Sequence, residues 1–311
     1  MIIGHQRQIQ LLDLHIRTDA LSHAYLFTGP RQVGKMTIAR RAAASVLCLK
    51  RPRGVLASCG TCQSCTTLAS QAHPDVFELS PGGGDAGKAP LRIGDIRDLR
   101  VRAGQSAYAG KKLFFVDDVS HSTHEAANAL LKVLEEPRGD TVFFLIAQQA
   151  QDVLPTIRSR AWQMRFWPVS YELLETCLVE NYHILPASAA CAARLAYGCP
   201  GAALEFCSLP PEILKKKAAE HTAQRTFLSC SAAERLESVD ALCDDPEKME
   251  LWYDEHIVAL GSAVHTMLGE ESCGVIHTAA LCRRLVEGRQ RFQKPYAAKR
   301  VIFESDVLHP Y

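Results

Sequence analysis

The chain has 311 residues, enough for two or three domains. Hydrophobic residues make up 47% and charged residues 22% of it, an ordinary globular balance, and no apolar run reaches the ~18 residues of a membrane helix. The formal net charge is +1, so no overall basic field favours autonomous DNA binding, although a local patch would. The N-terminal stretch has helical periodicity with charges throughout, so we expect no signal peptide, a cytoplasmic location and no membrane partner.

Residues 1–167 alternate helical and strand patterns, which predicts an α/β domain with a mainly parallel sheet. Ser122 and Glu125 are predicted to form a capping box at the start of a helix that ends before Pro137. In chain order, the expected elements are helix 5–19, strand 24–28, helix 35–49, strand 75–79, helix 93–104, strand 113–116, the capped helix, and strand 141–147.

After Pro168 the strand patterns stop. Residues 169–206 are predicted to form a small helical bundle that ends near the glycine pair of GCPG at 198–201. Residues 207–311 have amphipathic helical patterns without chemical motifs. The sequence therefore predicts an α/β domain followed by an all-helical region.

A phosphate-binding loop is predicted where the sequence reads GPRQVGKM between a strand and a helix. Gly29 and Gly34 would shape the turn, and Lys35 would reach the outer phosphates of ATP or ADP. A Ser or Thr that binds Mg²⁺ belongs next, but Met36 stands there, and a thioether is a poor ligand for a hard cation. Thr37 comes one residue late, roughly 100° round the helix. We therefore expect a weak or vestigial nucleotide site, with a tight turn that holds no nucleotide as the alternative.

The acidic end of strand 113–116 is also altered. Asp117 stands where a metal-coordinating Asp belongs in this class of site. Asp118 stands where a Glu positions the attacking water, and Asp is one methylene shorter. A solvated strand end is the alternative interpretation. With Met36, this pair predicts that the chain does not hydrolyse ATP efficiently.

Four cysteines follow the loop at the spacing C-x10-C-x2-C-x2-C: Cys48, Cys59, Cys62 and Cys65. Zinc prefers four soft ligands in a tetrahedron, and C-x2-C turns supply them compactly. We predict a closed, structural zinc module over residues 48–65 with no position left for catalysis. A redox pair would not need four cysteines, and a DNA-binding knuckle would carry stacking aromatics. The other eight cysteines show no ligand spacing and are interpreted as small apolar residues.

These stretches resemble the clamp loader subunits of bacterial DNA polymerase III. The similar segments are the strand HAYLF, the loop, the four cysteines, the helix EAANALLKVLEEP and the segment LPTIRSR, which is followed by Ala161 where the family has a cysteine. The resemblance covers residues 1–206. Met36, Asp118 and Gly201 depart from the ATP-hydrolysing gamma/tau motors, so the chain is more similar to the delta-prime branch.

The resemblance implies three parts: an AAA+ domain over 1–167 that bears the zinc module, a helical lid over 168–206, and a helical collar over 207–311 that joins five subunits in a ring. It implies a stator that is not catalytic alone and that helps gamma/tau motors and a delta subunit load the sliding clamp onto primer–template DNA. Arg160 would be an arginine finger for the neighbouring motor's ATP site, with Arg158 as the nearby alternative.

Two other functions stay open from the sequence. The chain would be an active AAA+ motor of the gamma/tau type if its phosphate loop hydrolyses ATP by itself. It would be a zinc-dependent nucleic-acid binder if the monomer binds DNA with a steep dependence on salt. For Arg160, the alternative is a charge that caps the carbonyl groups of a helix end.

Overall fold

The computed structural model describes residues 2–82, 89–137, 140–210, 212–214, 217, 249–250, 252–253, 257 and 273–292. The chain divides into two compact units, Met1–Val169 and Ser170–Tyr311. Each unit is described separately below. The predicted further division near residue 206 stays a prediction.

The first unit is built on a five-stranded, fully parallel sheet, which confirms the predicted fold class of this region. The spatial order is β2-β3-β4-β1-β5. In the register, Leu26 lies opposite Leu145, and Phe114 lies opposite Phe143. The strands are β1 (Ala24–Thr28), β2 (Val76–Leu79), β3 (Lys112–Val116), β4 (Thr141–Ala147) and β5 (Trp162–Arg165).

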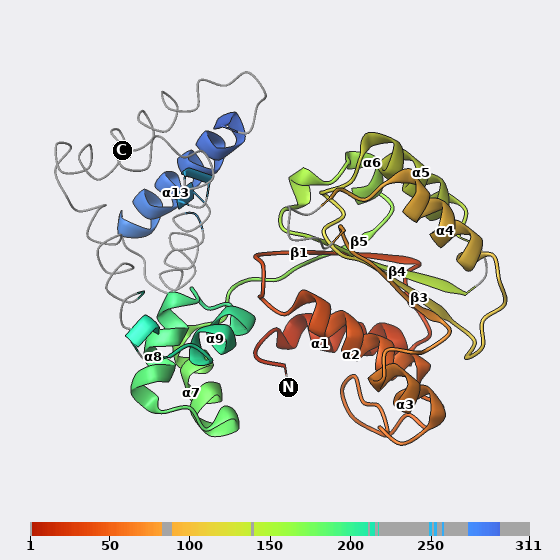
Figure 1. Cartoon of the computed structure of the whole chain (residues 1–311), viewed down its shortest axis with the longest axis horizontal. Coiled ribbons are helices and arrows are strands. Elements are labelled where there is room, and N and C mark those ends of the chain that lie inside the picture. The colour runs from red at the N-terminus through yellow and green to blue at the C-terminus, as the bar shows by residue number, and fades with distance from the viewer. Residues whose placement is uncertain are drawn as a thin grey trace. The chain divides into compact units, whose positions relative to one another are not determined.

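Helices cover both faces of this sheet, as expected where crossover connections join parallel strands. Figure 1 shows α1 and α2 on one face and α4, α5 and α6 on the other. The helices are α1 (Gln6–Arg17), α2 (Lys35–Leu47), α3 (Gln63–Ala69), α4 (Ile93–Ala103), α5 (His124–Glu135) and α6 (Pro155–Arg158), with a 3₁₀ turn at Ala150–Asp152.

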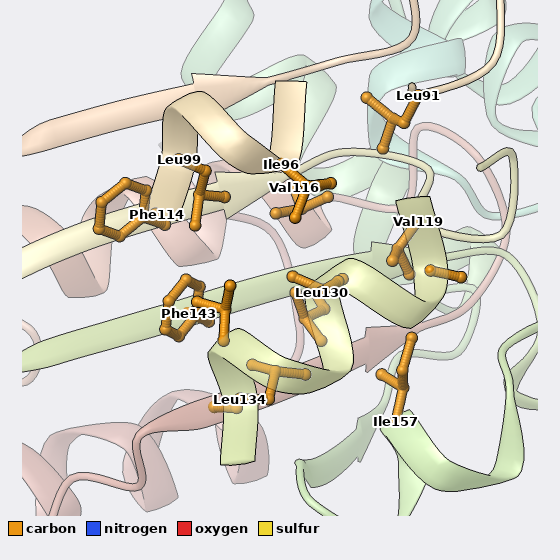
Figure 2. Packing of buried hydrophobic residues seen from close by; sticks show 14 of the residues in the cluster. Leu91, Ile96, Leu99, Phe114, Val116, Val119, Leu130, Leu134, Phe143 and Ile157 are labelled. Carbon is orange, nitrogen blue, oxygen red and sulfur yellow. The ribbon is translucent and has the colours of Figure 1, made fainter. Parts of the chain in front are cut away.

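The central strands read as continuous apolar runs because both of their faces are covered: β1, β3 and β4 are buried along their whole lengths. A hydrophobic core joins β3 and β4 to the helices above them (Figure 2). In this core, α5 contributes Leu130 and Leu134, and α6 contributes Ile157. These helices are therefore fixed to the sheet and to each other.

One local prediction was wrong, and one strand was missed. The N-cap of α5 is Thr123, whose hydroxyl accepts a hydrogen bond from the Ala126 N–H, whereas the Ser122 hydroxyl donates to the carbonyl of Val119. The helix therefore begins one residue later than the capping box predicted. Strand β5 was not predicted, because it lies at the sheet edge with only Met164 buried and so lacks an apolar run.

The second unit begins with three short helices, as predicted for residues 169–206: α7 (Tyr171–Tyr182), α8 (Pro186–Leu195) and α9 (Pro200–Cys207). The Ser170 hydroxyl caps α7, and α8 and α9 each begin with a proline, the residue whose missing N–H costs nothing there. Helix α13 spans Cys273–Phe292. Most of the predicted collar lies outside the described residues. None of the helices that the structure describes has both the length and the apolar character needed to span a membrane.

Candidate functional sites: a phosphate loop and a four-cysteine centre

The loop between β1 and α2 needs glycine at two positions for different reasons. Gly29 has φ +149°, and a Cβ there would lie 2.3 Å from the carbonyl oxygen of Phe166. Gly34 has φ +110°, but a Cβ there would meet nothing within 4 Å. Gly29 is therefore required by the close approach of the backbone that follows β5, whereas Gly34 is required by its own dihedral angle.

Lys35 is turned back onto its own loop. Its side chain is only 7% exposed, and the ammonium donates to the carbonyl oxygens of Gly29 and Pro30, each at 2.5 Å. The cation that the sequence predicts to bind phosphate is thus satisfied by main-chain oxygens, which a phosphate group would have to replace.

The first turn of α2 offers no oxygen ligand where Mg²⁺ would bind. Met36 follows Lys35 and is half-buried, and Thr37 is exposed one residue further along the helix. That Thr37 does not replace the missing hydroxyl stays a prediction from the helical spacing of about 100° per residue.

The structure brings Asp117 and Asp118 to the same carboxyl edge of the sheet as this loop. Asp118 has φ +48°, and its carboxylate accepts from the Ser120 hydroxyl at 2.8 Å and pairs with Arg31 at 3.5 Å. Asp118 is therefore tied to the predicted phosphate loop by an arginine of the loop itself.

Gln148 completes this edge and was missed by the sequence analysis. Its carbonyl accepts from the Gly29 N–H at 2.9 Å, and with its amide oxygen turned toward Arg31 it accepts from that guanidinium at 2.8 and 3.2 Å. Gln148 directly follows β4, as Asp117 directly follows β3. Because parallel strands end at one edge, that position was the signal that could have identified it.

The N-terminal segment packs against the loop through His5. The His5 Nε2 lies 3.0 Å from the Val33 carbonyl oxygen, and the imidazole packs edge-on to Phe166. Burial lowers the pKa of His5, the Val33 hydrogen bond opposes this, and the Lys35 charge lowers it further. His5 is therefore held in its neutral form next to the phosphate loop.

The four predicted cysteines come together at one point. Cys48 caps the C-terminus of α2, Cys62 caps the N-terminus of α3, and Cys65 lies in the first turn of α3. The four Sγ atoms lie within 4.8 Å of one another, and those of Cys59 and Cys65 are 3.9 Å apart. A tetrahedron with metal–sulfur bonds of ~2.3 Å has sulfur–sulfur edges of roughly 3.8 Å. The donor set therefore fits a four-coordinate metal ion.

Backbone N–H groups already point at these sulfurs. The Cys59 N–H donates to the Cys48 Sγ at 3.2 Å, and the Cys62 N–H donates to the Cys59 Sγ at 3.3 Å. Hydrogen bonds from Thr61 and Cys62 lower the pKa of Cys59 to about 6, whereas burial raises the pKa of Cys65 to about 12. A cation at the centre would favour the thiolate form of all four residues.

The cysteine module is anchored to the domain. The Leu56 N–H donates to the Asp13 carboxylate at 2.8 Å, and the Leu56 carbonyl accepts from Arg41 at 3.0 Å. Arg17 donates to the Gly54 carbonyl at 2.9 Å. Because Asp13 and Arg17 belong to α1 and Arg41 belongs to α2, a change at the metal centre would reach both helices.

Arg160 lies far from its own phosphate loop. Trp162 pairs with Tyr25 in the parallel β1–β5 ladder, so Arg160 precedes the amino end of these strands, whereas Gly29 follows their carboxyl end. A five-residue strand spans roughly 16 Å. The structure therefore brings Gly29, Gly34, Lys35, Asp117 and the cysteines into two sites but does not bring Arg160 to either.

Arg158, the alternative finger, is half-buried on α6. Its Nε is buried without a hydrogen-bond partner, and its carbonyl accepts from the Gln163 amide at 3.2 Å. The Arg160 side chain is 37% exposed, and its guanidinium forms an ion pair with Glu135 of α5.

Comparison with known proteins decides the family. A protein-family model described as DNA polymerase III, delta subunit, matches residues 4–170, more than half of the chain. The chain belongs to this family. This match confirms the resemblance to delta-prime-like clamp loader subunits that was inferred from the sequence.

Among curated relatives, this delta-prime-like chain is 43% identical over 143 residues to the DNA polymerase III subunit delta' of Pseudomonas aeruginosa, covering 46% of this chain and 42% of that protein. It is 36% identical over 175 residues to the delta' subunit of Bacillus subtilis, covering 56% and 51%. It is also 36% identical over 171 residues to the gamma/tau subunit of Mycobacterium tuberculosis, covering 53% and 28%. The match thus spans about half or less of each relative's length.

Proposed function

We propose that this chain is the delta-prime-type stator of a clamp loader. In this proposal it joins gamma/tau motor subunits and a delta subunit in a ring of five and helps load the sliding clamp onto primer–template DNA. Its first unit is an AAA+ domain, residues 168–206 are the lid and residues 207–311 are the collar. The family match and the two delta' relatives support this proposal.

The observation that carries the non-catalytic role is the composition of the phosphate-loop site. Met36 offers no hard oxygen ligand for Mg²⁺, and the Asp118 carboxylate is engaged by Arg31 and Ser120. Gly29, Gly34, Lys35, Thr37 and Asp117 then form at most a weak site for ATP or ADP, and the ATPase activity belongs to the partner subunits.

The proposed contribution of the stator to catalysis is Arg160. Because Arg160 lies at the opposite edge of the sheet from its own phosphate loop, it acts on the ATP site of a neighbouring subunit. A guanidinium stabilises charge on a transferring phosphoryl group, and such arginine fingers contribute on the order of 10³–10⁵ in rate.

The metal of the four-cysteine centre is proposed to be zinc with a structural role. Cys48, Cys59, Cys62 and Cys65 supply four sulfur ligands, which is the donor set that zinc accepts in closed sites. These residues would hold the fold of the module, and no coordination position would remain for a substrate.

Reconstitution with the cognate motor and delta subunits tests the function. DNA- and clamp-stimulated ATP turnover is measured with the intact chain, Arg160→Ala and Arg158→Ala. We expect the intact chain to support stimulation, Arg160→Ala to assemble without stimulating, and Arg158→Ala to behave as the intact chain. Stimulation by all three chains would show that neither arginine acts as a finger, and the chain would then have only a scaffolding role. Stimulation by none would contradict the clamp-loader function.

A gamma/tau-like motor is the second candidate, favoured by the 36% identity to a gamma/tau subunit. A motor would turn over ATP as the purified chain alone, and Lys35→Ala would abolish that turnover. The stator predicts background turnover for both proteins.

A further inference from the structure

The guanidinium of Arg160 is engaged at both terminal nitrogens by groups of its own chain. Its Nη2 forms an ion pair with the Glu135 Oε1 at 2.7 Å, and its Nη1 donates to the Thr156 carbonyl at 3.0 Å and to the Ser159 hydroxyl at 3.3 Å. Both terminal nitrogens therefore have partners in α5, in α6 and in the turn that follows.

The partner of this arginine is firmly placed. Glu135 is the last residue of α5, and Arg160 follows α6 by two residues. Leu130 and Leu134 of α5 lie in the same core as Ile157 of α6, as Figure 2 shows. Because this core fixes the two helices, the carboxylate and the guanidinium meet without ordering any loop.

We propose that Glu135 favours a retracted position of Arg160 in the free subunit, and that a strongly anionic neighbour shifts the finger to its extended position. This inference rests on the proposed function, since it concerns the same arginine. Glu135 acts here as a positioning residue, and the competing ligand is the polyphosphate of the adjacent subunit's nucleotide.

The exposure of the Glu135–Arg160 ion pair limits how strongly Glu135 can hold the arginine. The side chains are 37% and 46% exposed, and exposed ion pairs shift an equilibrium by no more than about fivefold. A nucleotide polyphosphate carries several charges and accepts bidentate guanidinium bonds, so it displaces a single carboxylate. The restraint is therefore weak enough to be overcome on assembly and strong enough to disfavour the extended finger in solution.

The adjacent residue provides a matched control. Glu136 is exposed, carries the same charge and forms no ion pair among those found in the described part of the chain. Glu135→Gln and Glu136→Gln each remove one negative charge from the C-terminal end of α5, where negative charge is unfavourable, so neither endangers the fold.

The first test uses the free, full-length chain. Phenylglyoxal modifies accessible guanidinium groups, and mass spectrometry resolves Arg160 from Arg158. We expect Glu135→Gln to speed modification of Arg160 by up to about fivefold at ~50 mM salt, with a difference that shrinks toward none at ~0.5 M salt. Glu136→Gln should leave the rate unchanged. An unchanged rate in Glu135→Gln, or an equal increase in Glu136→Gln, would overturn the proposal without bearing on the clamp-loader function.

The second test uses the reconstituted complex. We expect Glu135→Gln to reach half-maximal stimulation of motor ATP turnover at a lower chain concentration, by up to about fivefold, and to have no such effect in an Arg160→Ala background. Weaker stimulation by Glu135→Gln would mean that Glu135 orients the finger productively, which overturns the retraction. An Arg160→Ala chain that stimulates normally would remove the finger itself and, with it, this part of the proposed function.

Discussion

The cysteine centre and the phosphate loop are both recognisable sequence motifs, but the structure completes only one of them. The four cysteines supply a full set of ligands, with all Sγ atoms within 4.8 Å of one another. In the phosphate loop, Met36 leaves the metal position without an oxygen ligand, and Lys35 and Arg31 are bound by groups of the chain itself.

The two regions therefore differ in how much their fold depends on a ligand. The cysteine module lacks an extended core of its own and is expected to depend on a metal ion for its fold. The phosphate loop is built from main-chain contacts with β4 and with the end of β5, so it is expected to keep its shape without nucleotide. Four experiments test these expectations.

The largest effect is expected from Cys62→Ser. Losing one of four ligands should release the metal and destabilise the first unit by at least about 4 kcal/mol, because the module is tied to α1 and α2. This corresponds to a melting temperature lower by roughly 10 °C or more, measured by calorimetry. Elemental analysis should find one zinc per intact chain and none in the variant.

Cys177→Ser is the control, because Cys177 is half-buried in α7 and belongs to no metal-ligand group among the residues that the structure describes. It should cost less than about 1 kcal/mol. An intact chain without stoichiometric zinc, or a Cys62→Ser variant that melts like the intact chain, would contradict the structural metal site.

Gly29→Ala tests whether the phosphate loop is a packing feature. A Cβ there would lie 2.3 Å from the Phe166 carbonyl oxygen, so we expect a loss of about 3 kcal/mol in unfolding free energy in the absence of any nucleotide. Gly34→Ala, with strain but no clash, should cost about 1–2 kcal/mol in the same denaturation assay. Equal losses of unfolding free energy at Gly29 and Gly34 would argue against the close approach of the backbone that follows β5.

Met36→Thr supplies a hydroxyl oxygen at the position after Lys35, where Mg²⁺ would need a ligand. Nucleotide binding to the intact chain should be the same with Mg²⁺ as with a chelator, whereas the variant should gain about tenfold in affinity with Mg²⁺, measured by fluorescent-nucleotide titration. Met36→Ala adds no oxygen and should gain nothing. Magnesium-dependent binding by the intact chain would show that another group completes the site.

The smallest effect concerns His5. Burial lowers its pKa in the folded domain from the ordinary value of 6.5, so below about pH 6.5 the unfolded chain binds a proton that the folded chain does not. Stability should therefore fall as the pH falls through this window. His5→Asn tolerates the φ of +60° and does not titrate, so its stability should depend less steeply on pH. Parallel slopes from denaturant titrations at pH 7 and 5.5 would rule out this contribution.

The sequence predicted the structure correctly where the signal lies in residues that are close together in the chain. The apolar runs of β3 and β4 predicted buried parallel strands, and the cysteine spacing predicted a cluster. It failed where residues distant in the sequence meet. Arg31 and Asp118 are 87 positions apart, and no periodicity encodes their pairing. The contact of His5 with Val33 and that of Glu135 with Arg160 likewise depend on how helices pack, which a local pattern does not specify.

The close approach at Gly29 has a consequence for how such proteins are recognised in genomes. A residue fixed by the neighbouring backbone persists after nucleotide chemistry is lost, because the turn collapses without it. A pattern search anchored on this glycine therefore selects for the shape of the turn and not for nucleotide chemistry. The residue after the loop lysine, Met36 here, is the position at which such a search would look for a Mg²⁺-binding Ser or Thr.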